Sequence, residues 1–238
     1  MQLLLVDLRP TPAAPLEVTA GGRNVKVVDR RNIPGPASEL AVWLERAERG
    51  DSIICWGEGR TVREFPALRR RDQIGAAETL VVWTSPPGPE EFGRVLEMSD
   101  ARRLVMICGD QPAADATQFL RDLLGVIKFT ITHRGGEVAV ETLAGILAQR
   151  RTTILIALKL LKDAGWFTFE SIGQQVVIFR SLGEGPFQIA AWSSNPAAES
   201  LRRSLEETAA YRRYIVTAPI AELLPAGYLI VPPDEPVA

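Results

Sequence analysis

The sequence predicts an α/β protein, with a mostly parallel sheet in its first half, a helical module after it and a long helix near its end. Three observations carry this prediction. The first half alternates short, wholly apolar runs with amphipathic segments, as strands buried on both faces and their covering helices do. After residue 133 two helical segments and a hairpin pattern follow each other closely. A further amphipathic segment begins at residues 195–196 and ends near residue 216, and it predicts the last helix.

The predicted strands are short, continuously apolar and rich in β-branched residues. They cover residues 3–8, 25–29, 52–56, 79–84 and 103–108. Helices are predicted over residues 38–49, which open with a serine cap and stop at Gly50, and over 89–98, which open with proline and two acids. Residues 58–77 fit a loop with a short helix. Strands that alternate with helices in this way favour a Rossmann-like, largely parallel sheet.

The second half begins with a helix predicted from about Ala114 to the break at residues 133–136, because apolar residues recur at helical spacing. Helical segments at 137–149 and 151–164 and strands at 166–170 and 175–180 follow. Helix, tight turn, helix and hairpin is the order of a winged-helix module. We therefore predict an α/β domain over 1–115, a winged helix over 116–182, a strand (residues 187–191) and helix over 183–225, and a disordered tail over 226–238.

Charge and apolar runs limit the class of protein. The chain has 27 basic and 29 acidic side chains, a net charge of −2, which argues against coating nucleic acid by bulk charge. Residues 119–182 are the exception, with eight basic and five acidic side chains. No apolar run approaches the roughly 20 residues that cross a bilayer, and the start lacks the basic region of a secretion signal. We expect a cytoplasmic protein with no membrane partner.

Residue types that carry catalysis are scarce. The single histidine, His133, lies in a basic loop, where we expect a solvated or helix-capping side chain. Cys55 and Cys108 each end an apolar run, as small buried hydrophobes do. Neither C-x-x-C nor H-x-x-x-H offers a metal site, and Gly57 and Gly59 lack the third glycine of a dinucleotide-binding loop. We expect no catalytic residue, no metal and no cofactor.

The basic middle segment holds the candidate site. A helix-turn-helix presents the N-terminal side chains of its second helix to nucleic acid, and here that terminus contains arginines and threonines suited to phosphate. This hypothesis requires that the side chains of Arg150 and Arg151 are exposed to solvent. Protein docking stays open, because many winged helices dock proteins. The predicted nucleic-acid or partner-binding set is Lys128, Arg134, Arg150, Arg151, Thr152, Thr153, Lys159, Gln174 and Gln175.

Four stretches stand out by their order along the chain: LVVWTSPPGPEEFGRVL, FLRDLLGVIKFTITHRGGEVAVETLAGIL, LKLLKDAGWF and AYRRYIVTAPIAELL. Together they resemble the C-terminal region of the RecJ family of bacterial single-strand-specific DNA exonucleases, over roughly residues 1–225. The motifs are hydrophobic patterns and a loop with paired prolines, not catalytic signatures.

The departure from that family limits what the resemblance implies. RecJ-type nucleases cut with two metal ions held by aspartates and histidines of DHH-type motifs, and this sequence has no DHH and one histidine. The resemblance therefore implies a non-catalytic accessory role in DNA repair and recombination: guiding single-stranded DNA, or docking the tail of the single-stranded-DNA-binding protein. No site residue of the family transfers to a position here.

Two other hypotheses stay open. In a transcriptional regulator the winged helix reads duplex DNA and the α/β half senses a ligand, which predicts sequence-specific binding by a symmetric dimer. In an enzyme, acids at the strand ends, Asp7, Asp29 and Asp110, hold magnesium.

Overall fold

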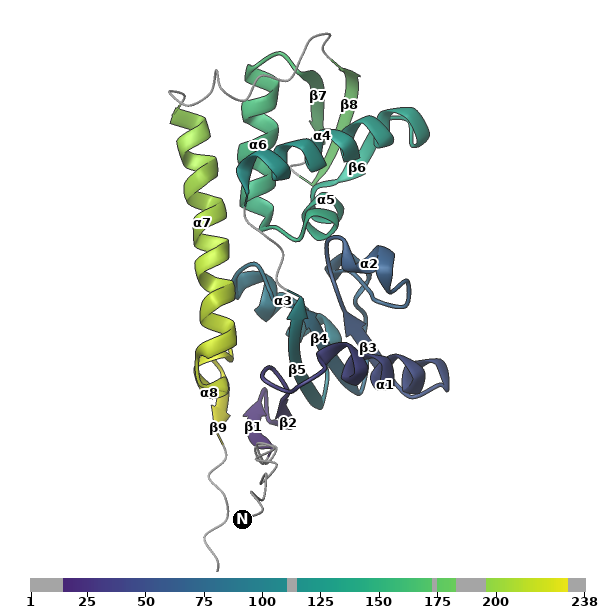
Figure 1. Ribbon diagram of the computed structural model, residues 1–238, viewed down its shortest axis with the longest axis vertical. Helices are drawn as coiled ribbons and strands as arrows, with labels where there is room; N and C mark the ends of the chain where they lie inside the picture. Colours follow the sequence, from purple (N-terminus) through teal and green to yellow (C-terminus); the bar gives the residue numbers. More distant parts are fainter. Residues whose placement is uncertain (1–14, 111–114, 173–174, 183–195, 231–238) are drawn as a thin grey trace, which may run out of the picture.

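A computed structural model describes residues 15–110, 115–172, 175–182 and 196–230. Figure 1 shows a sheet unit (residues 15–110), a helical unit (residues 115–182) stacked on it, and one long helix that runs along both. The predicted α/β class with a mostly parallel sheet is confirmed. None of the described helices is long and apolar enough to cross a membrane.

Six strands form the large sheet, in the order β3-β4-β5-β2-β1-β9. The parallel strands are β2 (Arg23–Asp29), β3 (Ile53–Trp56), β4 (Thr79–Thr84) and β5 (Arg103–Asp110), which confirms four of the five predicted strands. The fifth prediction, residues 3–8, lies outside the described residues.

Two antiparallel strands at one side of the sheet were not predicted. β1 (Leu16–Ala20) pairs with β2, and β9 (Tyr228–Ile230) pairs with β1. The expectation of disorder from residue 226 is therefore wrong for residues 228–230. These residues become ordered by pairing with a strand some 200 positions earlier in the sequence, and local composition does not encode such a contact.

Alternate residues of the central strands point to opposite faces of the sheet. On one face Leu80 and Leu104 pack with α3 (Pro89–Ser99) and the end of α7 (Pro196–Thr217). On the other face Val81 and Val105 pack with Leu40 of α1 (Pro36–Glu48). Burial on both sides explains why these strands are continuously apolar. As predicted, β3 and β4 are joined by a loop with short helices, α2 (Thr61–Glu64) and η1 (Arg71–Gln73).

The helical unit contains the predicted helices and hairpin, with one correction. Residues 137–139, predicted as the start of a helix, form a strand that pairs with β8, because Gly136 turns the chain at φ 85° after α4. The three strands lie in the order β6-β8-β7. The elements are α4 (Ala116–His133), β6 (Glu137–Ala139), α5 (Val140–Leu147), α6 (Arg151–Asp163), β7 (Phe167–Ile172) and β8 (Val176–Leu182).

The predicted last helix is confirmed as α7, which joins the two units. Its 22 residues span about 33 Å at 1.5 Å per residue. Leu201 and Leu205 belong to the core of the helical unit, whereas Ile215 belongs to the core of the sheet unit, as does Leu223 of α8 (Ile220–Leu223). One helix is therefore buried in both cores. The strand predicted at 187–191 lies outside the described residues.

Candidate functional site

The N-terminus of α6 faces α7. Nη2 of Arg150 donates to the carbonyl oxygen of Ser204 at 2.8 Å, to Ser204 Oγ at 3.2 Å and to Glu207 Oε2 at 2.7 Å. Thr153 is fully buried, with Oγ1 2.7 Å from Ser204 Oγ. The expectation that Arg150 is exposed to solvent is therefore wrong, and Thr153 also points inward. The partner helix lies about 50 residues away in the sequence, so the pattern around residue 150 contained no sign of this packing.

The opposite face of α6 is exposed and basic. Thr152, Lys159 and Lys162 are exposed there, Arg151 is half-buried, and Leu155 is 39% exposed. Helical spacing places these residues on one side of the helix, with Asp163 as the acid among them. Three predicted residues, Arg151, Thr152 and Lys159, thus come together. Lys162 was missed, although its position three residues after Lys159 would have indicated it.

The C-terminal end of α4 carries a second exposed basic cluster. Lys128 and Arg134, both predicted, are exposed there. Between them Phe129 is 51% exposed and stacks on His133, with ring centroids 4.6 Å apart and an interplanar angle of 20°. The Arg134 guanidinium carbon lies 5.9 Å from the centroid of the Phe129 ring. Phe129 was missed, although helical spacing places it on the side of α4 opposite the core residues Leu123 and Ile127, and that placement was a usable signal.

The predicted wing contributes little to either cluster. Gln175 is exposed, and its carbonyl oxygen accepts a hydrogen bond from the Val140 N–H at 2.8 Å. Gln174 lies outside the described residues. Across the hairpin, Arg180 pairs with Glu170 at 3.1 Å on the surface.

A buried polar network fills the junction of the two units, at the carboxyl ends of the parallel strands. Glu58 is fully buried and accepts from Nε of Arg71 at 2.5 Å and Nε1 of Trp56 at 3.0 Å. Its other oxygen accepts from Nη2 of Arg71. Nη1 of Arg71 is 4.0 Å from Glu91 and 3.8 Å from Glu141 of α5. One buried guanidinium therefore links three segments through their carboxylates.

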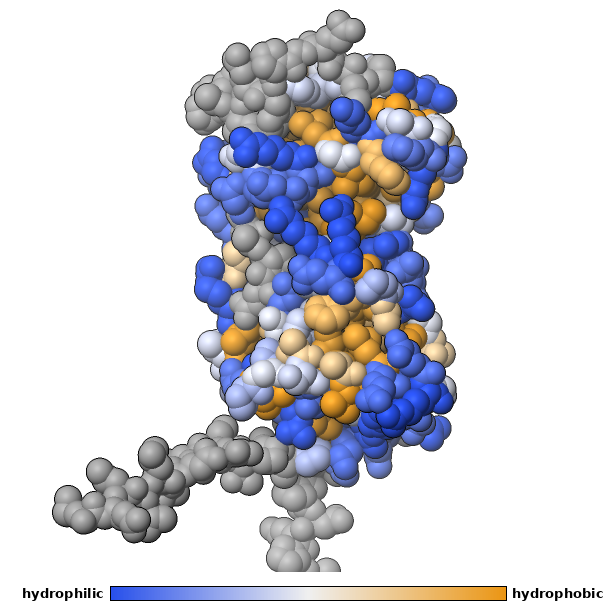
Figure 2. All heavy atoms as spheres, turned by 45° about the vertical axis from the view of Figure 1, so that its right-hand side comes forward, coloured by the Kyte–Doolittle hydropathy of each residue, from blue (hydrophilic) through white to orange (hydrophobic). Residues whose placement is uncertain are grey.

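Arg212 of α7 completes this junction. It is 2% exposed, and its guanidinium donates to the carbonyl oxygens of Ser85, after β4, and Ala148, after α5. Burial lowers the pKa of Arg212 to about 10, so it stays charged at neutral pH. Open α/β sheets often bind ligands at this edge, but here side chains of the helical unit and α7 occupy it. Figure 2 shows a hydrophilic band where the units meet, between hydrophobic residues gathered over each.

The strand-end acids have separate partners. Burial raises the pKa of Asp29, but the hydrogen bonds and charge of Arg31 outweigh it and hold that pKa below its ordinary value. Burial raises the pKa of Asp110, which accepts from Thr84 Oγ1 at 3.2 Å. Asp7 lies outside the described residues. Within the described ranges, no three His, Cys, Asp or Glu side chains are placed to hold a metal ion.

Both cysteines are buried and free, as predicted. Burial raises the pKa of the Cys55 thiol and of the Cys108 thiol to about 12, so both are protonated at neutral pH. A protonated thiol is a poor nucleophile. Neither cysteine therefore makes a catalytic nucleophile at this pH.

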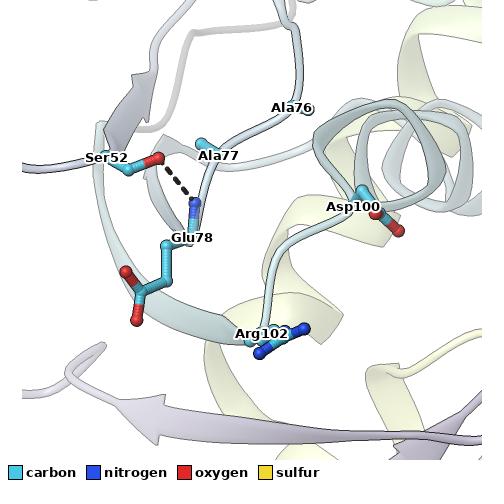
Figure 3. A pocket seen from close by; sticks show the side chains of 6 residues that line it. All are labelled: Ser52, Ala76, Ala77, Glu78, Asp100 and Arg102. Atoms are coloured by element: carbon cyan, nitrogen blue, oxygen red, sulfur yellow. Dashed lines mark hydrogen bonds between the residues drawn. The ribbon is translucent and has the colours of Figure 1, made fainter.

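The amino ends of the parallel strands border a shallow hollow of about 380 Å³, whose lining residues are Ser52, Ala76, Ala77, Glu78, Asp100 and Arg102 (Figure 3). Ser52 Oγ accepts from the Glu78 N–H at 3.0 Å. Figure 3 shows Glu78 and Asp100 pointing in different directions. The acids do not converge on a common point, so the hollow offers no set of ligands for a cation.

No protein-family model, no curated protein and no solved structure matches this chain. The candidate site therefore depends on its own geometry, above all on the basic faces of α6 and α4.

Proposed function

We propose that this chain is a non-catalytic accessory module that binds single-stranded DNA through two basic faces of its helical unit. The outer face of α6 carries the exposed cations Lys159 and Lys162 and the half-buried Arg151, with one acid, Asp163. This excess of cations at exposed positions is the observation that carries the proposal, because phosphate contacts by lysine and arginine supply most of the affinity for nucleic acid that does not depend on sequence.

The order of elements supports a winged-helix assignment for the helical unit. A helix, a short strand, two helices and a hairpin follow one another, and the short strand pairs with the second strand of the hairpin. Such modules bind nucleic acid or proteins. The resemblance to the RecJ C-terminal region agrees with this assignment and favours a role beside single-stranded DNA.

The packing of α7 favours a single strand over a sequence-specific duplex. Groove recognition uses the N-terminal side chains of the second helix, and here Arg150 and Thr153 are bound to Ser204. The residues of α6 that stay exposed are spread along the helix, and their cations suit the flexible sugar-phosphate backbone of a single strand. This is why the duplex-reading regulator is the weaker hypothesis.

Fluorescence anisotropy with a labelled oligo-dT strand over a salt series tests the proposal. The double variant Lys159→Ala plus Lys162→Ala removes two cations. The slope of the logarithm of the binding constant against the logarithm of salt concentration, here called the salt slope, is expected to fall in magnitude by about 1.4, at about 0.7 per phosphate contact. Affinity at roughly 0.1 M salt is expected to fall about 20-fold. The matched control is Lys26→Ala plus Arg63→Ala, two exposed cations of the sheet unit.

Unchanged slope and affinity in the α6 variant, or equal loss in the control, would contradict the proposal. If the protein binds an acidic peptide but does not bind the DNA strand, the basic faces belong to a protein partner instead.

A further inference from the structure

The environment of Phe129 is unusual for a large apolar side chain. It is 51% exposed at the outer side of α4, away from the core residues Leu123 and Ile127 of the same helix. It belongs neither to the core of the helical unit nor to the partly buried residues packed on it. Folding therefore gains little from an aromatic ring at this position.

Its neighbours are a second ring and two cations. His133, one helical turn later, stacks almost parallel on the ring, and its Nδ1 lies 3.2 Å from the carbonyl oxygen of Phe129, which holds the imidazole in place. Arg134 lies over the ring at 5.9 Å, and Lys128 is exposed beside it. Stacked rings flanked by cations are the arrangement that proteins use to hold unpaired bases with their phosphates.

The charges along this side of α4 favour an anion. Arg121, Lys128 and Arg134 are exposed. The acid among them, Asp122, accepts hydrogen bonds from Arg60 of the sheet unit and from Gln118, so part of its charge is already compensated. The next acid along the chain, Glu137, lies in β6 and is exposed. The surface around Phe129 thus keeps a positive balance.

We propose that the Phe129–His133 ring pair stacks an unpaired base, while Lys128 and Arg134 contact the flanking phosphates. This inference rests on the proposed function and makes it more specific: the ligand is a strand with free bases, recognised in part through their faces. A polyanion without bases would use only the cations. A base-paired duplex keeps its bases stacked inside and offers no face to the ring pair.

The test compares Phe129→Leu, which keeps apolar bulk but removes the aromatic face, with the wild type on two labelled strands of equal length, oligo-dT and an abasic strand. Anisotropy is expected to show a loss of about 5- to 150-fold on oligo-dT for the variant, which corresponds to the stacking of one base. The salt slope is unchanged because no charge is lost. On the abasic strand the two proteins bind equally.

Phe129→Trp supplies a second measurement. The indole keeps the stacking face, so affinity for oligo-dT is retained and the added tryptophan fluorescence is quenched by the strand and not by the abasic strand. Val42→Ala, at an apolar position of the sheet unit that is 53% exposed, is the control for loss of an exposed apolar side chain.

The outcomes separate the two proposals. If the wild type binds both strands equally and Phe129→Leu changes nothing, the stacking inference is overturned while the phosphate-binding function stands. If the wild type binds neither strand, the proposed function fails and the inference falls with it. If the wild type binds an acidic peptide more tightly than either DNA strand, and Phe129→Leu weakens that peptide binding, the ring pair belongs to a protein ligand and the inference is overturned.

Discussion

Replacing Glu58 by glutamine tests whether the buried network holds the two units together. The amide keeps the shape but removes the charge that faces Arg71, whose side chain is 2% exposed. Burial opposes the charged guanidinium of Arg71, yet Glu58, Glu91 and Glu141 keep its pKa above the ordinary value. Removing one partner of a buried pair costs about 3–5 kcal/mol. We expect the lower end, about 3 kcal/mol, because Glu91 and Glu141 still lie within 4.0 Å.

Urea denaturation measures this loss directly, and for a chain of this size it corresponds to a fall in Tm of roughly 6–12 °C. The control is Glu45→Gln, which breaks the exposed pair with Arg49 at the end of α1 and is expected to cost no more than about 0.5 kcal/mol. Arg71→Met should cost at least as much as Glu58→Gln, because it leaves the carboxylates of Glu58, Glu91 and Glu141 without the guanidinium that faces them. A cost below about 1 kcal/mol for Glu58→Gln alone would refute the reasoning.

Two further predictions concern Arg150 and Asp110. Arg150→Ala should lower the free energy of unfolding in urea by about 1.5–3 kcal/mol, because hydrogen bonds from a charged group are lost. The salt slope of strand binding should stay unchanged, and a reduced slope would return Arg150 to the binding surface. Because the pKa of Asp110 is raised above 3.8, the folded state holds this proton more tightly, and stability falls as pH rises through the raised pKa. Asp110→Asn should therefore gain stability relative to the wild type as the pH rises above the ordinary carboxyl pKa of 3.8, and a difference that does not vary with pH would contradict this.

The elements with strong local signals were predicted well. The strands at β3, β4 and β5 are apolar because both faces of the sheet are covered, and α1 and α3 begin and end close to the predicted residues. β1 and β9 were missed for the opposite reason. β1, with the sequence LEVTA, is not continuously apolar and buries only Val18 and Ala20, and β9 exists as a strand through its pairing with β1. A strand of three residues has no periodicity long enough to detect.

The candidate site was predicted in part. The basic segment was found because charge is visible in the sequence, and Lys128, Arg134, Thr152 and Lys159 do lie exposed. The prediction that the side chains at the N-terminus of α6 face solvent was wrong for Arg150 and Thr153. That side depends on where α7 docks, and Ser204 is 54 residues away from Arg150.

By itself, the sequence determined the class of fold, the order of the helices and strands, and the concentration of positive charge in residues 119–182, because apolar periodicity, caps and charge are properties of neighbouring residues. The tertiary structure alone decided which of those charges reach solvent. α7 is buried in both cores and engages Arg150, while Phe129 is left outside on α4. The physical reason is that burial is set by contacts between segments far apart in the chain, and a local pattern carries no information about the partner.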